Sequence, residues 1–219
     1  MKKTVLFVVM TVVAMAVASC GSTPKDGACH IHGTVTDKAL EGKRIFLVPL
    51  TGPATAATVD SVEIKDGKFE FTPDSMQMYK ILMDYHFRMG TQTLLVVAEP
   101  GNVNVTIGSI SHANGTPQND SLEKWKDVTE KHNLEYRQLS KASLDAKNAG
   151  RKAEADSLEA EARRVHVGYK KFTRRMSENL KEGVLHEFLG GLYPLTYKRK
   201  MSDGTIVVMD ADTNEPVAK

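Results

Sequence analysis

The segment NVNVTIGSISHANGTPQNDSLEKW, residues 102–125, contains the change from strand to helix that decides the fold. Its first six residues alternate polar and apolar side chains, which is the period of a half-buried β-strand. Further on, Asp120 and Glu123 have the spacing of a capping box at the start of a helix, with Pro117 just upstream. We therefore expect an α+β chain, in which a β-domain is followed by long helices.

Residues 30–115 contain short apolar runs separated by turn signals. Asp66-Gly67 lies between the runs 59–64 and 68–71, and this dipeptide is a strong hairpin signal because a type I′ turn needs positive φ at both positions. The run 68–71, KFEF, places both phenylalanines on one face. About seven such strands predict a small antiparallel β-sandwich or barrel-like domain. The other runs are 32–35, 44–50, 79–85, 93–98 and 102–107.

Residues 116–190 carry two apolar seams whose spacing alternates three and four, interrupted at 148–150. Two helices of about 25 to 30 residues joined by a tight turn should lie antiparallel. Small side chains then meet near the turn and large ones meet at the open end. We expect a long antiparallel αα-hairpin packed on its own domain; the alternative is a coiled coil that binds a partner. The seams are Leu122, Trp125, Thr129, His132, Tyr136, Leu139, Ser143 and Ala146, and Ala155, Leu158, Ala162, Val165, Tyr169, Phe172 and Met176.

The second helix is acidic in its first turns and basic from Arg163 to Arg175. This order suits the helix dipole, and the alternative is a contact with acidic lipid or another anionic surface. Beyond this helix, residues 184–193 predict a short apolar helical segment that is interrupted at Gly190-Gly191. Residues 191–219 form a C-terminal extension, in which 204–209 (GTIVVM) predicts one more strand.

The N-terminus resembles the signal peptide of a bacterial lipoprotein. Lys2 and Lys3 precede fifteen uncharged residues, 4–18, which is the length of a signal-peptide core and short for a membrane span. Val17-Ala18-Ser19-Cys20 then resembles a lipobox. In that family the chain is cut before the cysteine, whose thiol carries a diacylglycerol and whose amine is acylated, commonly with palmitate.

By this resemblance, residues 1–19 are a signal peptide, Cys20 is the site of lipid attachment, and residues 20–29 are a lipidated tether. Several acyl chains hold a soluble domain firmly to a membrane. Lipoproteins retained at the inner membrane often have Asp after the cysteine, whereas this chain has Gly21. We therefore expect an outer-membrane lipoprotein, on the periplasmic side or at the cell surface.

The charge and cysteine content exclude two classes of protein. The sequence has 29 Lys and Arg against 27 Asp and Glu, and both surplus cations lie in the signal peptide. A nucleic-acid binder keeps a clear basic excess, so we expect no nucleic-acid partner. The only cysteine besides Cys20 is Cys29, so neither an intramolecular disulfide nor a Cys-x-x-Cys oxidoreductase is expected.

No motif predicts catalysis, a metal site or a cofactor. Cys29-His30-x-His32 has the right residue types for a metal, but strand alternation places Cys29 on the face opposite the two histidines. His186-Glu187 is not a zincin motif, because Gly190 stands where the second histidine belongs. Four Asp-Ser-aliphatic triplets resemble a bacterial O-glycosylation motif, and the alternative is that they form turns and helix caps. They begin at Asp60, Asp74, Asp120 and Asp156.

Five short motifs follow one another in residues 30–125: Ile31-x-Gly33-x-Val35, Asp60-Ser61-Val62, Asp66-Gly67-Lys68-Phe69-Glu70-Phe71, Val97-x-Glu99-Pro100-Gly101 and Gly115-Thr116-x-x-Asn119-Asp120. In this order they resemble the domain of unknown function catalogued as number 4369. That domain occurs in many lipoproteins of Gram-negative gut-type bacteria, usually in front of a thioredoxin-like domain. The resemblance implies no catalytic residue. After residue 190 we expect neither a thioredoxin fold nor its redox motif.

The sequence thus predicts a membrane-anchored envelope lipoprotein that acts as a non-catalytic binding or scaffolding module with an envelope protein partner. One alternative is an accessory of a thiol–disulfide system, in which Cys29 would contact a separate thioredoxin-like protein. A second alternative is an enzyme whose site lies at the junction of the β-domain and the helices.

Overall fold

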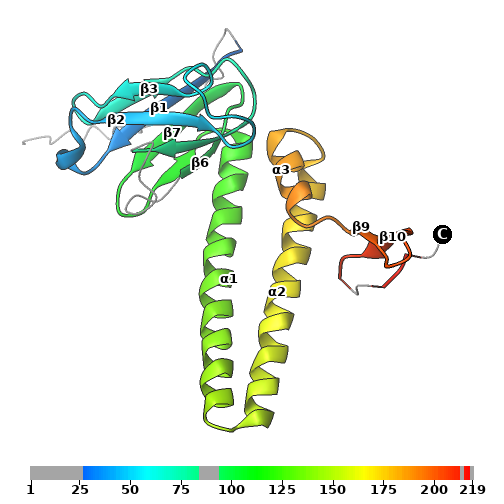
Figure 1. The fold of residues 1–219 in the computed structure, drawn as a ribbon. Helices are drawn as coiled ribbons and strands as arrows, with labels where there is room; N and C mark the ends of the chain where they lie inside the picture. Colours follow the sequence, from blue (N-terminus) through cyan, green and yellow to red (C-terminus); the bar gives the residue numbers. More distant parts are fainter. Residues whose placement is uncertain (1–26, 84–93, 213–214, 218–219) are drawn as a thin grey trace, which may run out of the picture.

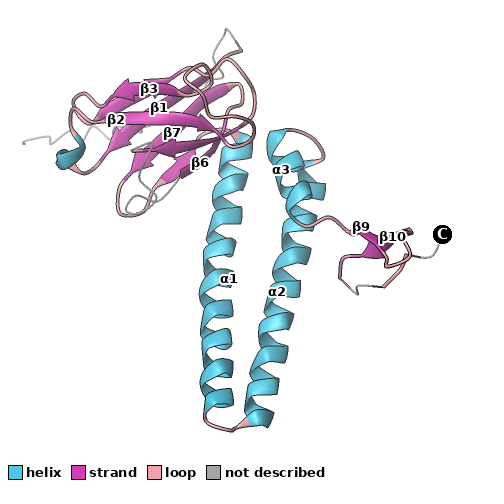
Figure 2. Cartoon of the chain, in the orientation of Figure 1, coloured by secondary structure: helices cyan, strands magenta, loops and turns pink. Residues whose placement is uncertain are grey.

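The computed structural model describes residues 27–83, 94–212 and 215–217. Eight strands form a β-domain from which a long helical hairpin projects, and a two-stranded ribbon follows the helices (Figures 1 and 2). The α+β architecture predicted from the sequence is confirmed. The signal peptide and Cys20 lie outside the described residues.

The first sheet has the order β4-β1-β7-β8, in which β1 spans Cys29–Val35, β4 spans Lys68–Phe71, β7 spans Gly101–Ile107 and β8 spans His112–Asn114. The alternation predicted for 68–71 and 102–107 is confirmed, because the apolar residues of both strands are buried. One feature differs from the expected antiparallel domain: β1 pairs with β7 in parallel. Strands far apart in the sequence can pair in either direction, and local alternation does not distinguish the two.

The second sheet has the order β3-β2-β5-β6, in which β2 spans Arg44–Pro49, β3 spans Asp60–Glu63, β5 spans Met78–Leu82 and β6 spans Leu94–Val97. All its pairs are antiparallel. A 3-10 turn, Lys38–Leu40, lies between β1 and β2. The inner faces of the two sheets share one apolar core, formed by residues such as Ile31, Ile45, Phe71, Ile81, Val96 and Val103.

The Asp66-Gly67 turn has the predicted backbone, with φ of 52° and 68°. The flanking residues Lys65 and Lys68 exchange both backbone hydrogen bonds, at 3.0 and 2.9 Å. Beyond this bridge the strands part, because β3 pairs with β2 and β4 pairs with β1. The predicted turn is therefore present, but the hairpin is limited to this one bridge, and the turn passes the chain from one sheet to the other.

The hairpin consists of α1, Pro117–Asn148, and α2, Lys152–Leu180, joined at Gly150 with φ of 75°. The predicted seams face each other, and Trp125 Nε1 donates a hydrogen bond to Thr173 Oγ1 at 3.2 Å. Helix α3, Val184–Leu192, folds back against α2. A second apolar cluster joins these helices to the second sheet; its buried members are Met78, Val97, Leu122, Trp125, Tyr169, Leu185 and Leu189.

Two predicted helix boundaries were wrong. Helix α1 begins three residues before Asp120, and the expected capping carboxylates bind the preceding segment instead: Asp120 Oδ1 accepts from Gly115 N at 2.9 Å and Glu123 Oε1 from Ala113 N at 2.8 Å. Helix α3 continues through Gly190-Gly191 to Leu192. A Cβ at Gly190 would lie 3.2 Å from Ser177 Oγ, so this glycine permits close packing on α2.

The β-domain and α1 are joined by two buried polar side chains. Asn119 is fully buried; its Oδ1 accepts from Val97 N at 2.9 Å and its Nδ2 donates to Val97 O at 2.8 Å, so its amide pairs with β6 as another strand would. Glu99, which is 6% exposed, accepts from the backbone N–H groups of Gln118 and Asn119 at 2.7 and 3.2 Å. This carboxylate supplies the N-terminal cap that Thr116 does not provide. We call Glu99 and Asn119 the junction clamp.

The C-terminal ribbon consists of β9, Thr196–Lys200, and β10, Ile206–Asp210; β9 is not predicted by the sequence. Arg174 on α2, only 9% exposed, holds the ribbon through two hydrogen bonds to Asp212, at 2.5 and 3.1 Å, and one to Tyr193 O at 2.7 Å. Lys170 lies 3.0 Å from the same carboxylate. Hydrogen bonds from these cations lower the pKa of Asp212 to about 2.

We expect Asn119→Ala to destabilise the chain by about 3 kcal/mol, because it leaves the buried N–H and C=O of Val97 without partners. The measurement is the free energy of unfolding in urea. Asn179→Ala, an exposed position on α2, is the matched control and should change that free energy by less than about 0.5 kcal/mol. Equal effects of the two substitutions would contradict the role assigned to Asn119.

Candidate functional site

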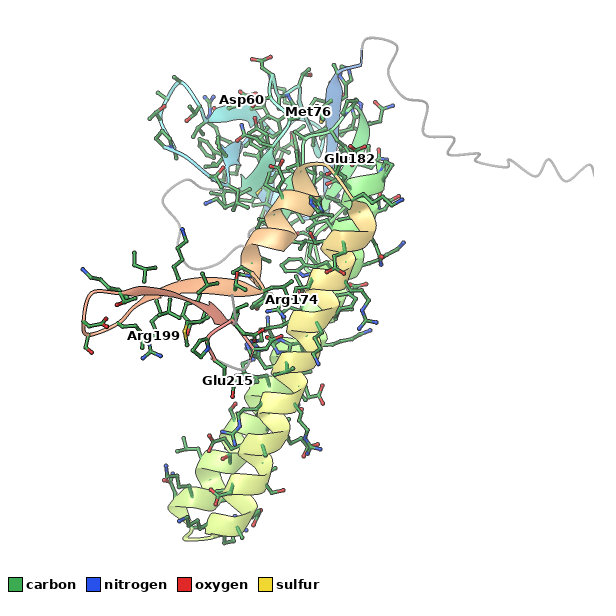
Figure 3. All side chains as sticks on the ribbon, turned by 90° about the vertical axis from the view of Figure 1, so that its right-hand side faces the viewer. Asp60, Met76, Arg174, Glu182, Arg199 and Glu215 are labelled. Atoms are coloured by element: carbon green, nitrogen blue, oxygen red, sulfur yellow. The ribbon has the colours of Figure 1, made fainter. Side chains whose placement is uncertain are left out.

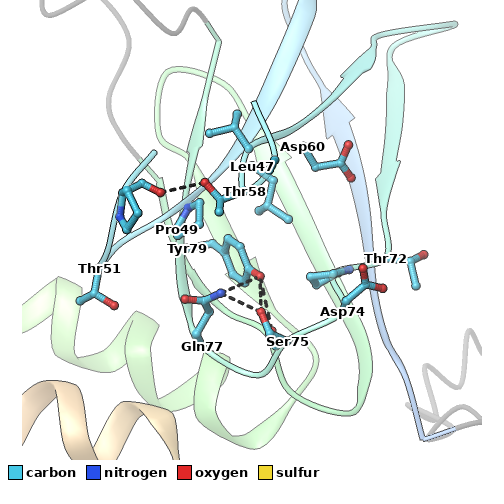
Figure 4. A pocket seen from close by; sticks show the side chains of 14 residues that line it. Leu47, Pro49, Thr51, Thr58, Asp60, Thr72, Asp74, Ser75, Gln77 and Tyr79 are labelled. Atoms are coloured by element: carbon cyan, nitrogen blue, oxygen red, sulfur yellow. Dashed lines mark hydrogen bonds between the residues drawn. The ribbon is translucent and has the colours of Figure 1, made fainter. Parts of the chain in front are cut away.

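The β-domain has a surface cavity of about 460 Å³ between the loop that follows β2 and the segment that joins β4 to β5 (Figure 4). This volume lies in the range of small-molecule sites. Proline and aliphatic side chains of β2 form part of the wall, and hydroxyl, amide and carboxylate groups form the rest. The polar lining includes Thr58, Asp60, Asp74, Ser75, Gln77 and Tyr79.

The polar wall of the cavity is held by side-chain hydrogen bonds. Gln77 Nε2 donates to Ser75 Oγ at 2.7 Å and to Tyr79 Oη at 3.0 Å, and the two hydroxyls lie 2.9 Å apart. Across the cavity, Thr58 Oγ1 donates to Pro53 O at 2.8 Å and fixes the loop after β2 (Figure 4). These groups are therefore positioned before any ligand binds, which reduces the entropy lost on binding.

The cavity carries negative charge only. Asp60 and Asp74 line it, and no Lys, Arg or His is among its lining residues. The carboxylate of Asp60 is partly engaged, because its Oδ1 accepts from Ser61 N at 2.7 Å. The field of two carboxylates repels an anion such as a phosphate or a carboxylate. Chemically, the site can accept hydrogen bonds from hydroxyl or amine groups.

A second, smaller groove of about 380 Å³ lies at the junction, between α1 and the segment before β8. His112 and Glu123 meet there, with Nδ1 and Oε2 3.3 Å apart, and Lys126 Nζ lies 2.6 Å from Glu123 Oε1. The same carboxylate accepts from Ala113 N and so fastens β8 to α1. Its oxygens are thus engaged in holding the fold, and the hypothesis of an enzyme with its site at the junction stays a prediction.

Cys29 is the one cysteine that the structure describes, and it is 6% exposed at the start of β1. Burial, together with the nearby charge of Glu99, raises the pKa of its thiol, although a backbone hydrogen bond at Glu99 acts in the other direction. His30 and His32 lie on the opposite face of the strand, with ring centroids 6.2 Å apart. Among the described residues, no three His, Cys, Asp or Glu side chains come close enough to hold a metal ion.

An aromatic and histidine cluster fills the middle of the helical hairpin, and the sequence seams named only part of it. The rings of His132 and Tyr169 stack at 4.1 Å, and His132 Nε2 lies 3.4 Å from His166 Nδ1. Burial and the neighbouring His132 and Lys170 lower the pKa of His166. Tyr193, beyond α3, packs against Tyr169 with the two rings nearly perpendicular and their centroids 5.8 Å apart. The cluster therefore ties α3 to the seam between α1 and α2.

Cys20, the lipid-attachment site expected from the sequence, lies outside the described residues, so its acylation stays a prediction. Within residues 27–83 and 94–212, none of the helices combines the length and apolarity needed to cross a bilayer. The cavity was not predicted. The sequence contained one indication of it: Asp60 and Asp74, which line the cavity, each begin one of the Asp-Ser-aliphatic triplets.

The geometry defines a class of protein: a two-sheet β-domain with a polar surface cavity, clamped to a helical hairpin. Residues 29–122 match the family model described as Domain of unknown function (DUF4369). The match includes the whole β-domain and ends in the first turns of α1, so it contains both residues of the junction clamp. No curated protein and no solved structure matches the chain.

We expect the Cys29 thiol to react slowly in the folded chain, because it is buried and its pKa is raised. Cys20→Ala protein leaves Cys29 as the single thiol, and its alkylation by iodoacetamide is followed at pH 8 with and without urea. Folding should slow the reaction at least about tenfold. Because the folded chain holds this proton more tightly, stability should also fall as pH rises past the ordinary pKa of the thiol. Equal rates in both states would contradict this assignment.

Proposed function

We propose that this chain is an envelope lipoprotein, anchored to the outer membrane through Cys20, whose β-domain is a non-catalytic binding module. The lipobox supports the anchor, and the observation that carries the binding role is the preorganised cavity between β2 and β5. The junction clamp supports a scaffolding contribution, because it fixes the helical hairpin to the domain that binds the ligand.

The ligand is a small, neutral, polyhydroxylated molecule such as a saccharide. Two carboxylates and several hydroxyls offer acceptors for ligand hydroxyl groups, and Gln77 offers an amide. The absence of any cation among the lining residues disfavours anionic ligands. Proline side chains of the wall, including Pro53 and Pro73, supply accessible apolar area for the C–H faces of such a ligand.

The thiol–disulfide alternative receives less support from the geometry. It requires Cys29 to meet a partner thiol, whereas this side chain is buried beside Glu99. A buried thiol with a raised pKa is a poor nucleophile. The alkylation experiment on Cys29 therefore tests this alternative as well.

The anchor is tested by expressing the full chain in a Gram-negative host. We expect wild-type protein to partition into the detergent phase and its N-terminal peptide to carry the mass of a diacylglycerol and an amide-linked acyl chain. Cys20→Ala should lose that mass, whereas Cys29→Ala, the matched cysteine control, should keep it. Wild-type protein without acyl mass at Cys20 would refute the anchor and leave the cavity proposal untouched.

The ligand class is tested by titration calorimetry with neutral mono- and disaccharides, the corresponding sugar phosphates and amino sugars. We expect neutral sugars to bind, phosphates to bind more weakly, and Asp74→Asn to weaken binding of the neutral sugar about tenfold through loss of a charged acceptor. Asp156→Asn, an exposed aspartate of α2, is the control and should change nothing. No binding of any neutral sugar, or binding of amino sugars alone, would overturn this assignment.

A further inference from the structure

Exposed apolar side chains are concentrated on the C-terminal ribbon and the residues that flank it. All five residues of β9 are exposed, and Ile206 on β10 is 64% exposed. Half of the exposed large apolar side chains of the described residues lie between 195 and 217: Leu195, Tyr197, Met201, Ile206, Val208 and Val217. A two-stranded sheet is marginally stable alone in water, and a concentration of exposed apolar side chains marks an interaction surface.

One edge of the ribbon is open. Met201 N donates to Thr205 O and Ala211 N donates to Leu195 O, each at 2.8 Å, so the odd-numbered residues of β9 direct their backbone groups toward β10. The even-numbered residues direct theirs to the opposite edge, and no strand of the described residues pairs there. These even-numbered residues are Thr196, Lys198 and Lys200.

The other edge of the ribbon is covered by the chain itself. Asp210 N donates to Glu215 O at 2.8 Å, and Val217 N donates to Val208 O at 2.9 Å. Residues 215–217 therefore extend the ladder beyond β10. The ribbon thus has one edge satisfied by its own chain and one edge with a row of unused donors and acceptors, which is the template for strand addition.

The open edge is strongly basic. Lys198 pairs with Val208 and Lys200 pairs with Ile206, so on one face the lysines lie beside exposed aliphatic side chains. Arg199 lies on the other face. A strand added next to β9 meets a cation on either face, so carboxylates on that strand form favourable cross-strand pairs.

The charge of the β9 edge disfavours a second copy of this chain as the occupant. Antiparallel pairing of two β9 edges would place the cations Lys198, Arg199 and Lys200 of both copies together, and like charges opposite each other are destabilising. A lipid surface matches the charge but offers no strand to continue the backbone ladder. A partner segment that is both extended and acidic satisfies the two features together.

The ribbon is also held in a fixed position on α2, with Arg174 at its base (Figure 3). Arg174 is buried, and a buried guanidinium is tolerated only when its donors are paired. Its partners are Asp212, Tyr193 O and Pro194 O, all in the C-terminal segment. The hairpin therefore presents the ribbon at one orientation, which reduces the entropy lost when a partner binds.

We infer that the open edge of β9 binds an extended acidic segment of a partner protein by strand addition, with carboxylates of that segment against Lys198 and Lys200. This surface lies on the C-terminal ribbon, outside the β-domain cavity, and its role does not depend on the ligand or on the lipid anchor.

The probe is a fluorescent peptide of about nine residues that alternates valine and glutamate, compared with its valine–lysine counterpart. Fluorescence anisotropy with the full chain measures affinity, and hydrogen exchange measures protection of the β9 amides. We expect the acidic peptide to bind and to protect Thr196, Lys198 and Lys200. Lys198→Glu with Lys200→Glu should weaken it at least about tenfold and should allow the basic peptide to bind.

Two matched controls separate charge from strand addition. Lys124→Glu with Lys131→Glu changes the same net charge on the exposed side of α1 and should leave binding unchanged. Lys198→Pro and Lys198→Ala remove the same charge, but only proline removes the edge N–H, so proline should weaken binding further. An acidic peptide that does not bind, or that binds without protecting β9, overturns the inference. Protection of β9 by phosphatidylglycerol vesicles alone would assign the ribbon to a lipid surface instead.

Discussion

The amide of Asn119 is the contact on which the arrangement of the two halves depends. A fully buried side chain forms both hydrogen bonds that a neighbouring strand would form with Val97, so the first turn of α1 is fixed at the edge of β6. Without the Glu99 carboxylate, the N-terminal amides of Gln118 and Asn119 would lose their acceptor. Gln118 Oε1 in turn accepts from Leu185 N at 2.8 Å and extends the network to α3. One polar network therefore sets the direction of α1 and the start of α3.

The elements that the sequence predicted are those whose pattern is local. Alternation located β4 and β7, and the three-four spacing located both long helices, because burial of one face is visible in a single segment. The sequence did not show which of these elements pair with one another. Asp66-Gly67 specified its own turn geometry but not the sheet to which each flanking strand belongs, because that choice depends on contacts of Phe69 and Phe71 with β1.

The same limit explains why Asp120 and Glu123 were assigned to a helix cap. A carboxylate near a helix start can accept from its own helix or from the segment before it, and the sequence spacing is the same in both cases. Here Glu99, eighteen residues before Pro117, occupies the capping position. The residues of the cavity could not be identified from the sequence for a related reason. They come from two separate segments, 47–60 and 72–79, which meet only in the folded domain.

Two cations in the basic second half of α2 have a structural role besides any interaction with the helix dipole. Of its cations, Arg174 and Lys170 bind Asp212 and hold its pKa near 2, so these charges secure the C-terminal ribbon. A buried guanidinium is tolerated only when its donors are paired, and here those pairs attach a ribbon that buries Met209 and leaves β9 exposed. Residues 215–217 cover the outer edge of β10, whereas no strand of the described residues pairs with the basic edge of β9. The attachment through Arg174 therefore fixes the orientation of an open, basic strand edge.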